Sequence, residues 1–253
     1  MIKLKTDEQI GLMATSGKVT GRILHELCGL IRPGVTTKDI DRFVEESILA
    51  EGMKPTFKGY GGFPASTCVS VNEELVHGIP SETRVLKEGD IVSVDVGVTY
   101  NGWVSDAART YAVGNVNGTA QRLIRTAKDS FFEGLKACRV GYKLGDIGHA
   151  IQARVEAEGF SVVLDYVGHG VGRQMHEHPQ VKNYGDPGSG APLAKGMALA
   201  IEPMINEGVS AVKTLPDGWT VVTEDSKLAA HYENTVIITD DAPLIITLDE
   251  RDI

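Results

Sequence analysis

The chain has few cysteines and no long apolar run. Its 253 residues include 3 cysteines, Cys28, Cys68 and Cys138, which are widely spaced and form no Cys-x-x-Cys pair. This usage argues against a disulfide framework and favours a reducing compartment. No segment approaches the ~20 apolar residues of a membrane span, and residues 1–7 lack the apolar core of a signal peptide. We therefore expect a soluble, cytoplasmic protein with no membrane partner.

Positive charge is also scarce, with 25 Lys and Arg residues against 34 Asp and Glu and a net charge of −9. Nucleic-acid-binding surfaces are usually basic, so we expect no sequence-specific nucleic-acid partner.

Phosphate-binding glycine loops are absent, because Gly59, Gly61 and Gly62 fit neither the Walker nor the dinucleotide pattern. The apolar content of 42% is that of an ordinary globular protein. With no clear linker, residues 1–253 are expected to form one catalytic domain.

Three carboxylates stand in or beside segments that read as buried strands. Asp95 interrupts the apolar run 91–98, Glu202 interrupts 197–205, and Glu233 precedes 234–239. An unpaired buried carboxylate costs on the order of several kcal/mol, and these runs contain no Lys or Arg. Any one of them could be a carboxylate at a frayed strand end. The three together predict a divalent cation as the shared counter-charge.

A hairpin adds a fourth acid. Segment 100–103, with Asn-Gly at its centre, is a strong signal for a two-residue turn. This turn would place Asp95 opposite Ala108 and put Asp106 one diagonal step away on the same face. Diagonal neighbours are ~7–8 Å apart at the backbone, a span that metal ions can bridge between two carboxylates.

The two halves of the chain look like diverged copies. Helices are predicted after Thr6 up to 33–34, from 36–37 to Gly52, over 119–138 and over 146–159. A shift of 107 residues superimposes helix, glycine turn, strand and strand acid. The matched pairs are Gly34 and Gly141, Asp39 and Asp146, Gly52 and Gly159, Gly89 and Gly196, and Asp95 and Glu202. We predict two α/β halves related by a pseudo-two-fold axis, each giving one acid to a shared centre.

Four carboxylates and an imidazole suit two closely spaced divalent ions. A structural zinc site prefers a closed set rich in Cys and His, whereas carboxylate-rich pockets with ions ~3.5–4 Å apart occur in aminopeptidases and phosphatases. The segment 176–178 does not have the His-Glu-x-x-His spacing of zinc proteases. The candidate ligands are Asp95, Asp106, His169, Glu202 and Glu233.

These ligands, in this order, resemble those of the type I methionine aminopeptidases. The segment 169–179 (HGVGRQMHEHP) is similar to the family signature, as are the sequences around Asp95 and Glu202 and the segments 76–80 and 217–220. Type II members have a long insertion between the ligands that correspond to His169 and Glu202, and this chain does not. The resemblance covers essentially the whole chain and implies a bare catalytic domain without an N-terminal extension.

The resemblance implies an α+β pita-bread fold, in which a central antiparallel sheet is covered by helices. It also implies removal of the initiator methionine from nascent polypeptides whose second residue is small. The implied partners are nascent N-termini and, as a further candidate, the ribosome; the implied state is a monomer. The metal could be cobalt, manganese, iron, zinc or nickel.

Ligand roles carry over by position. Asp95 would bind one ion, His169 and Glu202 the other, while Asp106 and Glu233 bridge the two. Glu202 also stands at the family's proton-shuttling position. Two histidines, His77 and His176, match those that contact the substrate backbone and stabilise the tetrahedral intermediate, although a lone histidine is more often structural.

The methionine side chain would enter an apolar pocket that suits a flexible thioether. Three positions depart from the commonest family pattern, namely Phe57 in place of Cys, Phe63 in place of Tyr and Met175 in place of Phe. The predicted pocket is Tyr60, Phe63, Cys68, Met175 and Trp219.

Two further histidines, His178 and His231, match no family ligand. We expect them at the surface or behind the ligands.

Two alternatives remain open. One is a proline-specific peptidase of the same fold, which usually carries a large additional N-terminal domain. The other is a binding module of this fold that has lost catalysis, although such proteins lose ligands and all five positions are occupied here.

Overall fold

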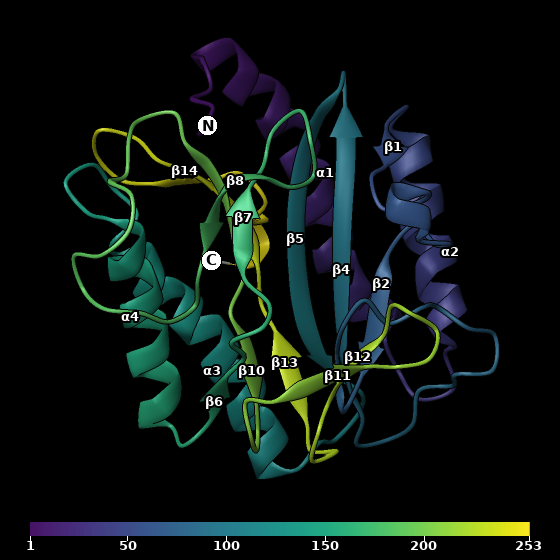
Figure 1. Ribbon diagram of the computed structural model, residues 1–253. Helices are drawn as coiled ribbons and strands as arrows, with labels where there is room; N and C mark the ends of the chain where they lie inside the picture. The colour runs from purple at the N-terminus through teal and green to yellow at the C-terminus, as the bar shows by residue number, and fades with distance from the viewer. Residues whose placement is uncertain (253) are drawn as a thin grey trace.

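The structure is a computed structural model that describes residues 1–252. Figure 1 shows helices at both flanks of a set of antiparallel strands. The helices are α1 (Asp7–Leu30), α2 (Thr37–Ala50), α3 (Gly118–Leu135) and α4 (Leu144–Ala157), with short 3-10 turns at Tyr60–Gly62 and Glu250–Asp252. All four predicted helices are therefore confirmed to within a few residues.

Strands of the first half surround a long hairpin. β4 (Ile91–Tyr100) pairs with β5 (Trp103–Ala112), and it also pairs with β1 (Lys54–Pro55) and β2 (Cys68–Val71). Helices α1 and α2 pack against this group and bury an aliphatic core between helix and sheet. The register that the Asn-Gly turn predicts is confirmed, because Tyr100 pairs with Trp103 and Asp95 pairs with Ala108.

Strands of the second half are shorter and form three sheets. One has the order β15-β14-β9-β7-β8, the second β13-β10-β6, and the third joins β11 and β12 to β3 of the first half. The bounds are β3 (Glu74–Val76), β6 (Ser161–Val162), β7 (Gly168–Gly170), β8 (Glu177–Val181), β9 (Ala198–Ile201), β10 (Met204–Asn206), β11 (Val212–Thr214), β12 (Val221–Thr223), β13 (Ala229–His231), β14 (Asn234–Ile237) and β15 (Leu244–Ile245).

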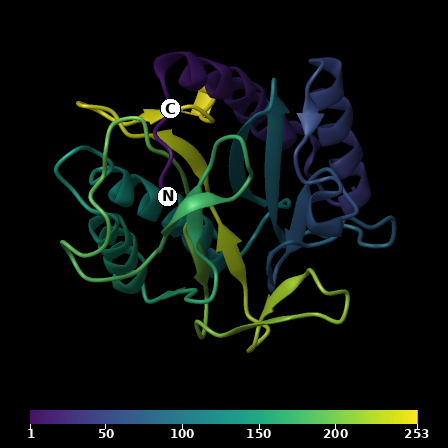
Figure 2. The ribbon, with the colours of Figure 1, turned by 45° about the horizontal axis from the view of Figure 1, so that its top comes forward.

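The 107-residue repeat is visible in the backbone. An isolated bridge joins Thr36 to Val85 in the first half, and the same bridge joins Lys143 to Pro192 in the second. At both helix starts an aspartate accepts a hydrogen bond from the backbone N–H of the capping residue three positions earlier. Strands β4 and β9 begin 107 residues apart, at Ile91 and Ala198. Figure 2 shows the helix pairs of the two halves flanking the strands from a second direction.

The halves meet where β5 runs beside the start of β14. The backbone N–H of Glu233 donates to the carbonyl of Ala108 at 2.9 Å, and the N–H of Ala108 donates back at 3.4 Å. The hydroxyl of Thr235 accepts from the N–H of Asp106 and donates to its carbonyl. This contact brings acids of the two halves together. Over the described residues, no helix is both long and apolar enough to cross a bilayer.

Candidate metal centre and its pocket

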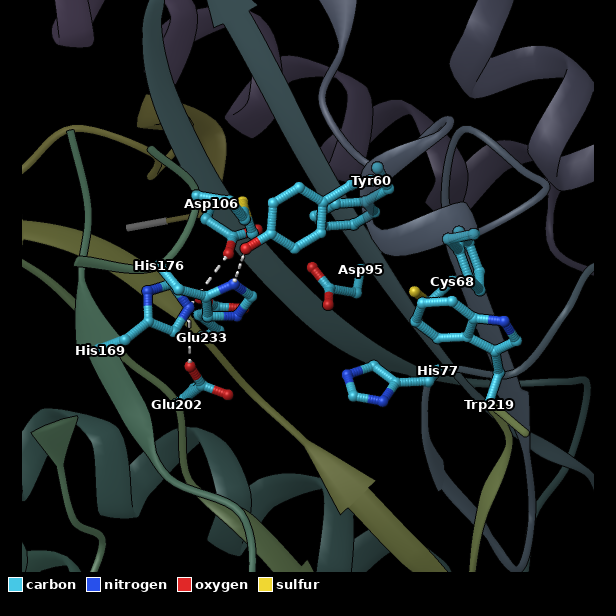
Figure 3. Close-up of a pocket in the computed structure, with 13 residues that line it drawn as sticks. Tyr60, Cys68, His77, Asp95, Asp106, His169, His176, Glu202, Trp219 and Glu233 are labelled. Carbon is cyan, nitrogen blue, oxygen red and sulfur yellow. Dashed lines mark hydrogen bonds and ion pairs between the residues drawn. The ribbon is translucent and has the colours of Figure 1, made fainter. Parts of the chain in front are cut away.

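A cavity of about 150 Å³ lies between the two halves, and Figure 3 shows its lining. All twelve site residues predicted from the sequence line this cavity, and Phe57 is the thirteenth. The lining is Phe57, Tyr60, Phe63, Cys68, His77, Asp95, Asp106, His169, Met175, His176, Glu202, Trp219 and Glu233. The structure thus brings every predicted residue to one place.

The first two acids are positioned by the β4–β5 hairpin. Asp106 pairs with Gly97, two residues from Asp95 on β4, so the two carboxylates share a face as predicted. A side chain at Gly97 would collide with the ring of Phe57, since its Cβ would lie 2.6 Å from Phe57 Cε1. The missing side chain opposite Asp106 therefore makes room for one wall of the cavity.

Second-half strands supply the remaining donors. Glu202 directly follows β9 and Glu233 directly precedes β14, and β9 pairs with both β14 and β7. His169 lies on β7 opposite Ala200, two residues before Glu202. Its imidazole Nδ1 donates to the carbonyl of Gly170 at 3.0 Å, because a carbonyl oxygen can only accept. The Nε2 atom is then left with its lone pair, as a metal ligand requires.

The Nε2 atom of His169 faces two acids. It lies 3.4 Å from Glu202 Oε1 and 3.7 Å from Asp106 Oδ2. Donor atoms of Asp106, His169 and Glu233 all lie within 4.8 Å of one another, and those of Asp95, His231 and Glu233 form a second such group. The two groups of possible metal ligands therefore share Glu233.

The buried oxygens of these acids have no counter-charge. Asp95 Oδ1, Asp106 Oδ1 and Glu233 Oε1 are buried and have no hydrogen-bond partner among the described residues. Within the same part of the chain, no Lys or Arg side chain forms an ion pair with any of the four carboxylates. The nearby Arg109 guanidinium instead donates to the backbone carbonyl of Glu233 and to Asn234 Oδ1. Orphaned oxygens converging without a cation are the donor set that divalent metal ions require.

The protonation equilibria reflect this crowding. Burial raises the pKa of Asp95 to about 7, and burial together with the neighbouring acids raises the pKa values of Asp106, Glu202 and Glu233 well above the ordinary range. Burial lowers the pKa of His169 to about 3, so its imidazole is neutral near pH 7. These raised pKa values agree with the prediction that burial and mutual repulsion oppose ionisation of all four acids.

The other end of the cavity is apolar. Cys68 pairs with Asp95 across β2 and β4, and burial with that carboxylate nearby raises the pKa of its thiol, which keeps it neutral. The rings of Phe63 and Trp219 meet edge to face with centroids 5.2 Å apart. Trp219 lies between β11 and β12 and is therefore distant in the sequence from Phe63, which it contacts.

Two further histidines, His77 and His176, line the same cavity. The ring of His176 is 4.3 Å from that of His169, and its Nδ1 lies 2.8 Å from the hydroxyl of the half-exposed Tyr60. His77 adopts φ 61°, in the left-handed region that residues other than glycine seldom occupy. The following Gly78 packs against strand β2, where a Cβ would lie 2.2 Å from the carbonyl of Val69. Strain at a cavity wall is typical of a functional position.

The two additional histidines have different environments. His178 is exposed, which agrees with the expected surface position. His231 is only 2% exposed, and its Nε2 lies 3.8 Å from both Glu202 and Glu233. Of the two positions expected for it, at the surface or behind the ligands, His231 therefore has the second. Its spacing agrees with this, because residues two apart, such as His231 and Glu233, point to the same side of a strand.

The chain as a whole is similar to known proteins. Residues 11–240 match the model for metallopeptidase family M24. The chain is 54% identical to a methionine aminopeptidase of Clostridium acetobutylicum over 99% of this chain and 100% of that one. Its structure superimposes on the methionine aminopeptidase of Thermotoga maritima with a TM-score of 0.97 at 48% identity, covering 98% and 100% of the two chains.

A more distant likeness concerns the proline-specific alternative. The prolidase of Pyrococcus furiosus superimposes with a TM-score of 0.79 at 23% identity, and the match covers 98% of this chain but 66% of the prolidase. At that identity the likeness shows the pita-bread fold alone. On the family match and the identities above, this chain belongs to metallopeptidase family M24.

Proposed function

We propose that this chain is a two-ion aminopeptidase that releases the N-terminal methionine from peptides whose second residue is small. The observation that carries the proposal is the juxtaposition of the acid and histidine cluster with an apolar, sulfur-containing pocket in one cavity. A cluster of this kind without the pocket would fit other metal hydrolases equally well. The relatives named methionine aminopeptidase support the same conclusion.

Five side chains would hold the ions. Asp95 would hold one ion and His169 with Glu202 the other, and Asp106 and Glu233 would be shared between the two. The neutral imidazole of His169 and the orphaned oxygens of the acids fit divalent ions of the cobalt, manganese, iron, zinc or nickel type. When bound, two such ions lower the pKa of water from 15.7 towards ~7 and thereby supply a nucleophile at neutral pH.

The remaining residues would act on the substrate. The methionine side chain would lie among Phe63, Cys68 and Trp219, which places its peptide bond near the acids. His77 and His176 would donate hydrogen bonds to the peptide group, where they stabilise charge on its oxygen as it develops. Glu202, whose pKa is raised by burial, would accept a proton and pass it to the leaving amine.

A direct assay tests the proposal. Met-Gly-Gly, Met-Phe-Gly and Ala-Pro-Gly are each incubated with the protein, with and without a chelator, and again after metal is returned. We expect cleavage of Met-Gly-Gly alone, loss of cleavage with chelator and recovery with metal. Preferential cleavage before proline would support the prolidase alternative, and no cleavage of any peptide would support a binding module.

We place the reaction in the cytoplasm, with a monomeric enzyme acting on new polypeptides as they leave the ribosome. The small cavity supports only the action on chain ends, because it has room for a polypeptide terminus. Sedimentation of the protein with and without translating ribosomes tests both the monomeric state and the ribosome association.

A further inference from the structure

His231 occupies a position that the five expected ligands do not explain. It ends strand β13, is 2% exposed, and points its Nε2 atom at two acids of the cluster. Nε2 lies 3.8 Å from Glu202 Oε2 and 3.8 Å from Glu233 Oε2, and it has no hydrogen-bond partner among the described residues. A buried nitrogen without a partner is unfavourable, so a ligand that it could bind would stabilise it.

The backbone of His231 is fixed from the first half of the molecule. The hydroxyl oxygen of Thr110 accepts from the N–H of His231 at 2.9 Å and donates to its carbonyl at 2.8 Å. Because a hydroxyl has only one hydrogen, the 2.8 Å contact between Ser93 and Thr110 must be donated by Ser93. Thr110 is therefore fully hydrogen-bonded, and it holds His231 in a fixed position beside the acids.

The distances fit metal ligation better than a hydrogen bond. Ligand atoms at ~2.0–2.2 Å from one ion can be at most ~4.4 Å apart, and 3.8 Å lies within this limit. The same 3.8 Å exceeds the ~2.7–3.2 Å of an N–H···O hydrogen bond. Donor atoms of Asp95, His231 and Glu233 lie within 4.8 Å of one another, as do those of Asp106, His169 and Glu233.

We infer that His231 is a sixth protein ligand, and that it binds the ion held by Asp95 and Glu233. Each of the two ions then has one imidazole, His231 on one side and His169 on the other. This inference rests on the two-ion centre of the proposed function. A second nitrogen donor makes the centre less suited to manganese, which prefers oxygen ligands, and better suited to iron, nickel or zinc.

Counting imidazoles in the cobalt-loaded protein tests the inference. Cobalt(II) shifts the proton resonance of a ligating imidazole N–H far outside the normal range, so each ligating histidine gives one exchangeable, shifted signal. We expect two such signals in the natural protein, one in His231→Gln and one in His169→Gln. The matched control is His178→Gln, which removes an exposed histidine and should retain two signals.

Calorimetric titration of the metal-free proteins with cobalt gives a second readout. Loss of residues behind metal ligands costs about 10–100-fold in affinity, so His231→Gln should weaken one of the two binding events by at least ~100-fold. His178→Gln should leave both unchanged.

The outcomes are distinct. A natural protein that binds two cobalt ions and cleaves Met-Gly-Gly but shows a single imidazole signal would overturn the inference and leave the proposed function intact. Two signals persisting in His231→Gln would overturn it equally. A natural protein that binds no cobalt would overturn the proposed function and the inference together. Because the signal count in the natural protein requires no variant, poor folding of His231→Gln cannot decide the matter.

Discussion

Asp95 and Glu202 occupy equivalent places in the two halves of the molecule. The two residues are 107 positions apart in the sequence. Asp95 follows Ile91, the first residue of β4, by the same number of positions as Glu202 follows Ala198, the first residue of β9. Both carboxylates line one cavity, and the charge of Asp95 contributes to the raised pKa of Glu202. The duplication thus explains why a single centre draws acids from segments so far apart in the sequence.

Replacing a bridging acid should remove metal, whereas replacing a pocket residue should not. In Asp106→Asn we expect bound metal to fall well below two ions per chain and cleavage to drop by more than about 100-fold. Loss of a residue that supports a metal ligand already costs about 10–100-fold in metal affinity or activity, and loss of the ligand itself should cost at least as much. Phe63→Ala should keep both ions and lose activity through a higher KM. Metal analysis and Met-Gly-Gly kinetics measure both. Similar, mild losses in the two variants would contradict the two-ion centre.

The metal-free protein should become less stable as the pH rises above about 6.5. Folded Asp106, Glu202 and Glu233 have raised pKa values and keep protons that the unfolded chain, with ordinary pKa values near 4, has released. The folded state then binds more protons, so the free energy of unfolding falls by up to about 1.4 kcal/mol per pH unit for each such group. His169 and His231, with pKa values lowered to about 3, act in the opposite direction only below ~6.5.

Thermal unfolding of metal-free protein between pH 7 and 9 measures this dependence. Glu233→Gln replaces a titrating acid with a neutral amide and should flatten the curve, and added metal should flatten that of the natural protein. A metal-free protein whose unfolding temperature is constant over this range would show that the acids are ionised without cations.

Some features of the fold and of the site could be predicted from the sequence, because they depend on contacts between residues close together in the chain. The hairpin register was predictable because Asn101 and Gly102 both adopt positive φ, 48° and 75°, as their residue types favour. The repeat was predictable because Asp39 and Asp146 make the same local hydrogen bond. Such features depend on residues that are near one another in the chain.

Features that depend on distant pairing were not predictable from pattern alone. The residue types do not show that β11 and β12 pair with β3 and so carry Trp219 to the pocket. The reciprocal bonds between Ala108 and Glu233 are likewise set by the packing of the two halves. For the roles of the pocket residues, the resemblance to a known family supplied what periodicity could not.

His176 should matter for the rate and leave metal binding unchanged. Removing one donor to a developing oxyanion costs about 10²–10³ in kcat, so His176→Ala should lose activity to that extent while still binding two ions. The control is His178→Ala, two residues away and exposed, which should be as active as the natural protein. Equal activity of both variants would remove His176 from the catalytic machinery.

Helix α4 should depend on a glycine at its contact with the loop after β8. A Cβ at Gly148 would lie 2.5 Å from the carbonyl of Tyr184, which is backbone and cannot move away easily. Gly148→Ala should therefore destabilise the protein by about 1–3 kcal/mol. In Gly29→Ala, at a helical glycine with no atom near its Cβ position, stability should be unchanged or up to ~1 kcal/mol higher. Chemical denaturation distinguishes the two, and equal stability of both variants would contradict this packing.

Anomalous scattering from crystals grown with cobalt tests the central claim most directly. Two peaks are expected, ~3.5–4 Å apart, surrounded by Asp95, Asp106, His169, Glu202 and Glu233 at the base of the apolar pocket. A single peak, or peaks on other residues while this cluster remains without metal, would contradict the account.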